Sequence, residues 1–225
     1  MHDYEYKTSD VDLSNMSPIL EAYPHLEVLQ VRGFGNDDYE YSGNGLKFNP
    51  MRHEHLKTLI LEIGYALSHQ IIQQICTLEL PFLEYLELWL GNDDYYPIWQ
   101  YEEESHLLDE SAINHLKPII SGKLFSHLKY LGLRSSNYSD VIAKSIVKSP
   151  LMNSLRVLDL SMGTLTDKGA NILLNCPAIN NLHTLDISRN LLSTSMTQQL
   201  SQLKCRVIAE PQTNDTEYQY HAITE

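Results

Sequence analysis

The chain has 225 residues, 43% of them hydrophobic, which fits one domain with a continuous core. Its formal net charge of −13 argues against nucleic acid or an anionic membrane surface as a partner, because both need a basic face. Three widely spaced cysteines, the lack of a run of about 18 apolar residues and a polar start predict a cytoplasmic protein without a disulfide, a membrane span or a secretory signal.

The first elements predicted along the chain are short. Residues 1–16 are polar and predict a loose or edge-like start. Residues 17–23 combine a proline near the first turn with apolar residues at helical spacing, which predicts a helix. A stretch rich in Gly, Asn and Asp, residues 33–54, predicts a loop.

The pattern L-x-x-L-x-L, or a close variant of it, recurs along the rest of the chain. Its alternation places apolar side chains on one side of a short strand. The last two copies lie 182 − 155 = 27 residues apart, a period typical of leucine-rich repeats. We therefore predict an α/β leucine-rich-repeat solenoid, with a parallel concave sheet of about six to seven strands and convex helices. The six copies begin near Leu26, Leu56, Leu83, Leu128, Leu155 and Leu182.

Helical spacing between these copies predicts helices at residues 66–78, 140–148, 166–176 and 194–203. Ser68 and Thr166 are candidate N-caps, and a final edge strand is predicted within residues 205–211. The spacing 128 − 83 = 45 indicates an insertion within residues 91–122, and insertions in solenoids often lie at the binding face. These elements predict a single domain over residues 1–211, followed by a polar tail over residues 212–225.

Several stretches together resemble one family. They are LEAYPHLEVLQVRG, ELPFLEYLELWLG, LFSHLKYLGLRSS, VLDLSMGTLTDKGANILLNCP and LHTLDISRN. They resemble short bacterial leucine-rich-repeat proteins of the ribonuclease-inhibitor-like class, over roughly residues 11–203. The resemblance implies a fold but no activity, because none is established for that family. Members are usually longer at the N-terminus, which implies an open edge at the strand near Leu26 and self-association through it.

The outward positions of the third and fourth strands carry the first candidate site. Tyr85 and Trp89 alternate on one strand, Tyr130 and Arg134 on the next, and Gly132 is expected to leave a gap between them. Tyr, Trp and Arg are the residue types enriched at interface hot spots, so these four predict a partner-binding patch. The alternative is that Trp89 is covered by the insertion and belongs to the core.

Acidic residues surround this patch, and Glu62 and Glu87 are expected to border it. Between Lys57 and Lys117 the chain has eleven acids and no Lys or Arg, and the motif GNDDY occurs twice, at residues 35–39 and 91–95. Such a rim would steer a basic protein partner, although a solvated loop has the same composition. The predicted partner-binding residues are Tyr85, Glu87, Trp89, Tyr130, Arg134, Glu62, Asp93 and Asp94.

These features predict a non-enzymatic protein-interaction module, an adaptor or an inhibitor, that uses the concave face and the acidic rim. The alternative is an enzyme, or a substrate-recruiting subunit, with a carboxylate and histidine site near His53 and His55. No catalytic residue, metal or cofactor is predicted. His53 and His55 have no identifiable further ligand, and no Gly-rich phosphate loop, nucleophile elbow or HExxH motif is present.

Overall fold

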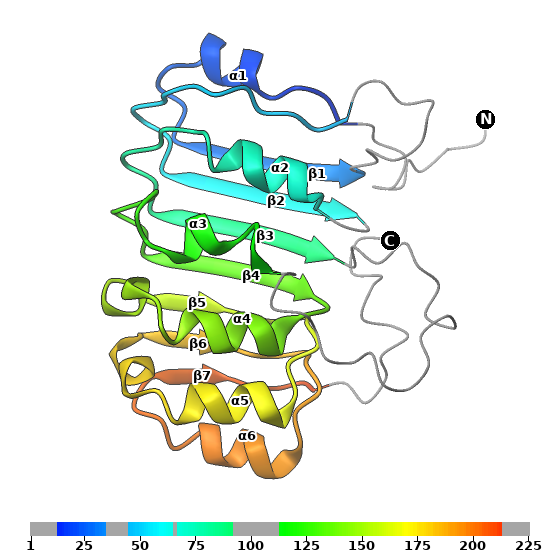
Figure 1. Cartoon of the computed structure of the whole chain (residues 1–225), viewed down its shortest axis with the longest axis vertical. Coiled ribbons are helices and arrows are strands. Elements are labelled where there is room, and N and C mark those ends of the chain that lie inside the picture. Colours follow the sequence, from blue (N-terminus) through cyan, green and yellow to red (C-terminus); the bar gives the residue numbers. More distant parts are fainter. Residues whose placement is uncertain (1–12, 35–44, 65–66, 92–112, 213–225) are drawn as a thin grey trace, which may run out of the picture.

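A single parallel sheet organises the chain. The computed structural model describes residues 13–34, 45–64, 67–91 and 113–212. Neighbouring strands follow chain order and every adjacent pair is parallel (Figure 1), which confirms the predicted α/β class, the six strands and the final edge strand. The strands are β1 (Val28–Phe34), β2 (Thr58–Gly64), β3 (Tyr85–Gly91), β4 (Tyr130–Ser136), β5 (Val157–Asp159), β6 (Thr184–Asp186) and β7 (Arg206–Ile208).

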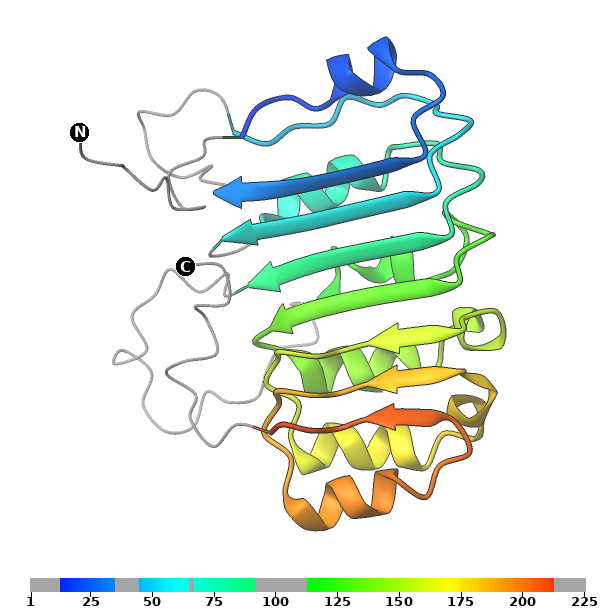
Figure 2. The ribbon, with the colours of Figure 1, turned by 180° about the vertical axis from the view of Figure 1, so that it is seen from behind.

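Helices cover one face of this sheet. In Figure 1 the helices from α2 to α6 lie in front of the strands, and α1 lies at the β1 end. Figure 2 shows the opposite face, which none of the described helices covers; we call it the helix-free face. The helices are α1 (Ser17–Ala22), α2 (His69–Ile75), α3 (Lys117–Ile120), α4 (Ser139–Ile146), α5 (Asp167–Leu174) and α6 (Thr194–Leu200), with 3-10 turns η4 (Pro150–Asn153) and η5 (Pro177–Asn181).

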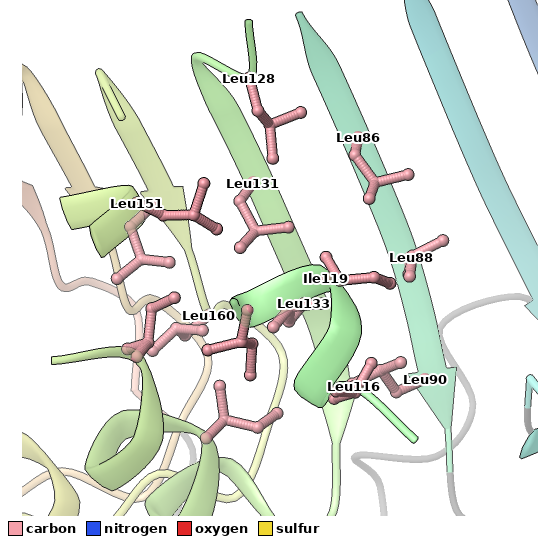
Figure 3. Close-up of a cluster of buried hydrophobic side chains, with 14 of the residues drawn as sticks. Leu86, Leu88, Leu90, Leu116, Ile119, Leu128, Leu131, Leu133, Leu151 and Leu160 are labelled. Carbon is pink, nitrogen blue, oxygen red and sulfur yellow. The ribbon is translucent and has the colours of Figure 1, made fainter. Parts of the chain in front are cut away.

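The core lies between the sheet and the helices. Alternation along each strand turns the leucines toward the helices, and the parallel register sets Leu59, Leu86 and Leu131 side by side, each fully buried. Figure 3 shows the leucines of β3 and β4 facing Leu116 and Ile119 at α3. Each fully buried leucine contributes about 1.5–3 kcal/mol, so the rows stabilise the stacking of neighbouring strands.

Helices α2, α5 and α6 begin at hydroxyl caps, and the caps of α5 and α6 also join neighbouring helices. The hydroxyl of Ser68 accepts from the backbone of α2 and that of Thr166 from α5, as predicted. The carboxylate of Asp140 in α4 accepts from both the backbone N–H (2.8 Å) and the hydroxyl (2.6 Å) of Thr166. Asp167 in α5 binds the backbone N–H and the hydroxyl of Ser193, the cap of α6, in the same way. The beginnings of α4, α5 and α6 are therefore fixed relative to one another.

Two regions contain more structure than predicted. Helix α3 lies within the predicted insertion and buries Ile119 and Ile120. The predicted loop after β1 carries Leu46 and Phe48, which are fully buried and join Leu13 in the core at the β1 end. Core at this end is therefore covered, and no other described strand pairs with the outer edge of β1. Self-association through that edge stays a prediction.

Some predictions lie outside the described residues: the loose start over residues 1–12, the bulk of the insertion over 92–112, both GNDDY motifs apart from Gly91, and the tail from residue 213. Over the ranges that are described, no helix combines the length and apolar character needed to cross a membrane.

Candidate functional site

The four residues predicted as a patch do meet on the helix-free face. The register pairs Tyr85 with Tyr130 and Trp89 with Arg134 across β3 and β4. The two tyrosine rings are stacked, with centroids 3.8 Å apart and planes 8° from parallel. The guanidinium carbon of Arg134 lies 4.6 Å from the centroid of the Trp89 ring, a cation–π distance. All four side chains are half-buried.

Glu87 is at the centre of this group, and the prediction that it borders the patch is wrong. Its carboxylate accepts from the Tyr85 hydroxyl (2.6 Å), the Trp89 indole N–H (2.7 Å) and Arg134 Nη1 (2.8 Å). The larger side chains on either side cover the shorter acid, so Glu87 is only 4% exposed. A strand position that faces away from the helices is therefore not necessarily exposed to solvent in this sheet.

The gap expected at Gly132 is also filled. A Cβ atom at this position would lie 3.0 Å from Cε1 of Tyr130 and 3.1 Å from Cγ of Glu87. The missing side chain is thus what allows Glu87 to lie across β4 and reach Arg134. A larger residue at 132 would displace one of these two side chains.

A second buried carboxylate, which was not singled out from the sequence, completes the group. Asp159 on β5 accepts from the Tyr130 hydroxyl (2.7 Å) and the Ser161 N–H (2.9 Å), and lies 3.6 Å from Nε of Arg134. The strand register could have identified Asp159 from the sequence, because it places Asp159 beside Gly132 on the neighbouring strand. We call Tyr85, Glu87, Trp89, Tyr130, Arg134 and Asp159 the central network.

The electrostatics of the central network favour a fixed ion pair. Burial tends to raise the pKa of Glu87, but hydrogen bonds from Tyr85 and Trp89 and the charge of Arg134 outweigh it, so that pKa falls below its ordinary 4.5. Burial raises the pKa of Asp159 despite its hydrogen bonds and Arg134. It also raises the pKa values of the Tyr85 and Tyr130 hydroxyls, which therefore stay protonated as hydrogen-bond donors at neutral pH.

The remaining predicted residues are placed differently. Glu62 turns toward β1, where it accepts from Gln30 Nε2 (2.9 Å) and pairs with Arg32 (3.3 Å). Asp93 and Asp94 lie outside the described residues, so the acidic rim stays a prediction.

The helix-free face also holds an open pocket of about 350 Å³ where β1 to β4 begin. It shares the stacked tyrosines with the central network and extends away from Trp89. Nothing in the leucine pattern predicted it, since a pocket depends on the side-chain sizes of four strands at once. Its lining residues are Glu27, Val28, Lys57, Thr58, Glu84, Tyr85, Lys129 and Tyr130.

His53 and His55, the basis of the alternative enzyme hypothesis, hold neighbouring turns together. His53 is buried, with Nδ1 accepting from the Leu56 N–H (3.0 Å) and Nε2 3.1 Å from the Tyr23 carbonyl oxygen. Nδ1 of His55 lies 3.0 Å from the Pro24 carbonyl oxygen. Within the described ranges, His, Cys, Asp and Glu form no group of three or more that could hold a metal ion.

Comparison with known proteins gives one informative likeness. No family profile matches the chain, and no curated protein matches it. A crystal structure of a Bacteroides fragilis protein, determined as a structural genomics target, superposes with a TM-score of 0.73 and 27% identity over 91% of this chain. The match covers 52% of that protein, so the chain spans about half of its length. The two share an α/β fold with a parallel sheet, solenoid-like in this chain.

Proposed function

We propose that the chain is a leucine-rich-repeat protein of the ribonuclease-inhibitor-like class that binds a protein partner through its helix-free face. It would act without catalysis, as an adaptor or an inhibitor. The observation that carries the proposal is the central network, a group of half-buried aromatic and arginine side chains held in place on an uncovered sheet face.

Recurring backbone geometry supports the repeat class. Ser135, Met162 and Arg189 adopt left-handed conformations with φ of 55°, 62° and 53°. They lie 162 − 135 = 27 and 189 − 162 = 27 residues apart. Each donates its N–H to a carbonyl beside the next strand, at Ser161, Ser188 and Pro211 in turn. A non-glycine residue is uncommon in this conformation, so its return at a constant interval is typical of a repeated unit.

The rigidity of the central network supports binding. Immobilising a free side chain at an interface costs about 0.5–1.5 kcal/mol, and hydrogen bonds within the chain have already ordered Tyr85, Trp89, Tyr130 and Arg134. Tyr, Trp and Arg are also the residue types on which binding energy concentrates. A partner would therefore meet a preorganised surface.

Charge supports a basic partner. The network holds two carboxylates, Glu87 and Asp159, against the one cation of Arg134. The whole chain has 29 acidic residues against 16 Lys and Arg. Complementary potentials mainly raise the rate of encounter, so added salt should slow association more than it speeds dissociation.

The test is to capture partners from a lysate of the source organism with the full chain and to identify them by mass spectrometry. Trp89→Ala should then weaken binding of the captured partner by about 2 kcal/mol or more, which is roughly 30-fold in Kd measured by calorimetry. Val157→Ala, on the same face but outside the network, is the matched control and should leave Kd nearly unchanged. Unchanged affinity of Trp89→Ala would refute the proposal, and so would unfolding of this variant, seen by circular dichroism.

A further inference from the structure

The pocket at the beginning of β1 to β4 is bounded by matching residues from four consecutive strands. One row of residues lines it at the strand starts: Glu27, Lys57, Glu84 and Lys129. A second row follows directly: Val28, Thr58, Tyr85 and Tyr130. Two residues before the first row, each strand is preceded by a ring-bearing side chain: His25, His55, Phe82 and His127.

The charges that line the pocket cancel in pairs. Nζ of Lys57 lies 2.6 Å from a carboxylate oxygen of Glu27, and Nζ of Lys129 lies 2.7 Å from one of Glu84. A polyanion or a polycation would therefore meet as much repulsion as attraction at this place. The pocket is complementary to an uncharged group, in contrast to the central network with its excess carboxylate.

Two exposed apolar side chains, Val28 and Phe82, lie at the same end of the strands as the pocket. Among the described residues the large hydrophobic side chains that stay exposed are Ile19, Tyr23, Val28 and Phe82. The first two belong to α1 or directly follow it, and the others lie at the start of β1 and just before β3. Val28 lines the pocket with 54% of its surface exposed.

The stacked tyrosines give the pocket an aromatic wall. Tyr130 covers one face of the Tyr85 ring at a centroid distance of 3.8 Å. On the opposite side, the register partner of Tyr85 is Thr58, whose short side chain cannot cover a ring, and Val28 lies one strand further. The second face of Tyr85 is therefore directed over Thr58, where a further ring can stack at the usual offset geometry.

We infer that this pocket receives an aromatic side chain presented by the protein partner. The inference rests on the proposed function and adds a second contact, distinct from Trp89 and Arg134. A free small molecule would need 70–90% of its surface enclosed, whereas this pocket is open to solvent. A ring carried on a protein loop needs less enclosure, because the surrounding loop seals the rim.

The experiment is a selection of scaffold-displayed loops against the folded full chain, with a free aromatic amide, N-acetyl-tyrosinamide, and a free cationic one, N-acetyl-lysinamide, as comparison probes. We expect selected loops to depend on one Tyr, Trp or Phe. Binding should fall at least about tenfold when Thr58→Trp fills the pocket. Val157→Trp, in the same row on β5, is the matched control and should change binding less than about twofold.

Other outcomes would overturn the inference. One is that the selected loops depend on Lys or Arg rather than on an aromatic residue. Another is that a free amide binds as tightly as the loops, and a third is that Thr58→Trp leaves loop binding unchanged. Pairing of the chain with itself that Thr58→Trp abolishes, seen by sedimentation, would assign the pocket to a second copy instead. Val28→Glu, a charge introduced at the pocket edge, replaces Thr58→Trp if that variant fails to fold. Trp89→Ala keeps this pocket, so it tests the proposed function separately.

Discussion

Replacing Glu87 by glutamine tests whether the central network is held together by charge. The substitution keeps the size of the side chain and one acceptor oxygen, and the new amide N–H can donate to the Tyr85 hydroxyl, which is able to accept. What it removes is the negative charge beside Arg134, whose Nη1 lies 2.8 Å from the carboxylate. Its effect therefore isolates the ion pair from the packing.

The magnitude follows from burial. The side chain of Glu87 is 5% exposed and that of Arg134 is 23% exposed, so solvent screens this pair weakly. A hydrogen bond to a charged group contributes about 1.5–3 kcal/mol, and Asp159, 3.6 Å from Nε of Arg134, retains part of the compensation. We expect Glu87→Gln to cost about 2 kcal/mol of unfolding free energy. Glu84→Gln, which removes an exposed pair between the residue just before β3 and Lys129 just before β4, should cost about 0–1 kcal/mol.

The pH dependence has a definite sign. The folded pKa of Glu87 lies below 4.5, so its stabilisation is complete above that pH and is lost as the pH falls. Asp159, whose pKa is raised, has the opposite effect in both proteins; because it shares Arg134 with Glu87, its contribution cancels only in part in their difference. The gap between wild type and Glu87→Gln should shrink by about 1.4 kcal/mol for each pH unit between 4.5 and the folded pKa.

Urea denaturation at pH 7 and pH 3.5 measures both quantities. Equal costs for Glu87→Gln and Glu84→Gln at pH 7 would show that burial does not strengthen the central pair. A gap as large at pH 3.5 as at pH 7 would show that the Glu87 carboxylate is not stabilised by its neighbours, and the account of the network would be wrong.

Three further variants test the packing by denaturant titration. Leu158→Ala should cost about 2–5 kcal/mol, because this side chain is fully buried; a loss below about 1 kcal/mol would contradict its place in the core. Gly169→Ala should destabilise the fold, because the added Cβ would lie 2.7 Å from Cδ1 of Leu165 and 2.9 Å from the Asp140 backbone. Overpacking costs about 1–3 kcal/mol, which exceeds the helix-propensity gain of about 1 kcal/mol. A net increase in the free energy of unfolding would contradict this. Arg189→Asn should stabilise by about 0.5 kcal/mol, since asparagine tolerates a φ of 53° better; a loss above about 1 kcal/mol would refute this.

The strands were predictable because the spacing of the leucines directly indicates which side chains lie on the same face of the sheet. Leu59, Leu86 and Leu131 needed only the alternation rule to be placed in one buried row. The caps Ser68 and Thr166 were predictable for a similar reason, because a short hydroxyl before an apolar helical pattern satisfies the first free N–H groups. These are local rules, and they hold whatever the neighbouring strand contains.

The candidate site was predictable in position but not in burial. Alternation places Glu87 on the helix-free face, yet its burial depends on Tyr85 and Trp89 on its own strand and on Tyr130 and Arg134 across the register. Helix α3 was missed because it lies in the stretch where the 27-residue spacing becomes 45 and the pattern gives no guidance.

The central network and the pocket depend on the same two rings. The Tyr85 hydroxyl donates to Glu87 and the Tyr130 hydroxyl to Asp159, so both rings are anchored at their far ends while their stacked bodies line the pocket. These hydrogen bonds restrict the side-chain torsions of both tyrosines. Their conformational entropy is therefore lost during folding rather than on binding. The buried carboxylates thus act at a distance from any partner: they hold the aromatic wall in one orientation, against which an incoming ring can stack.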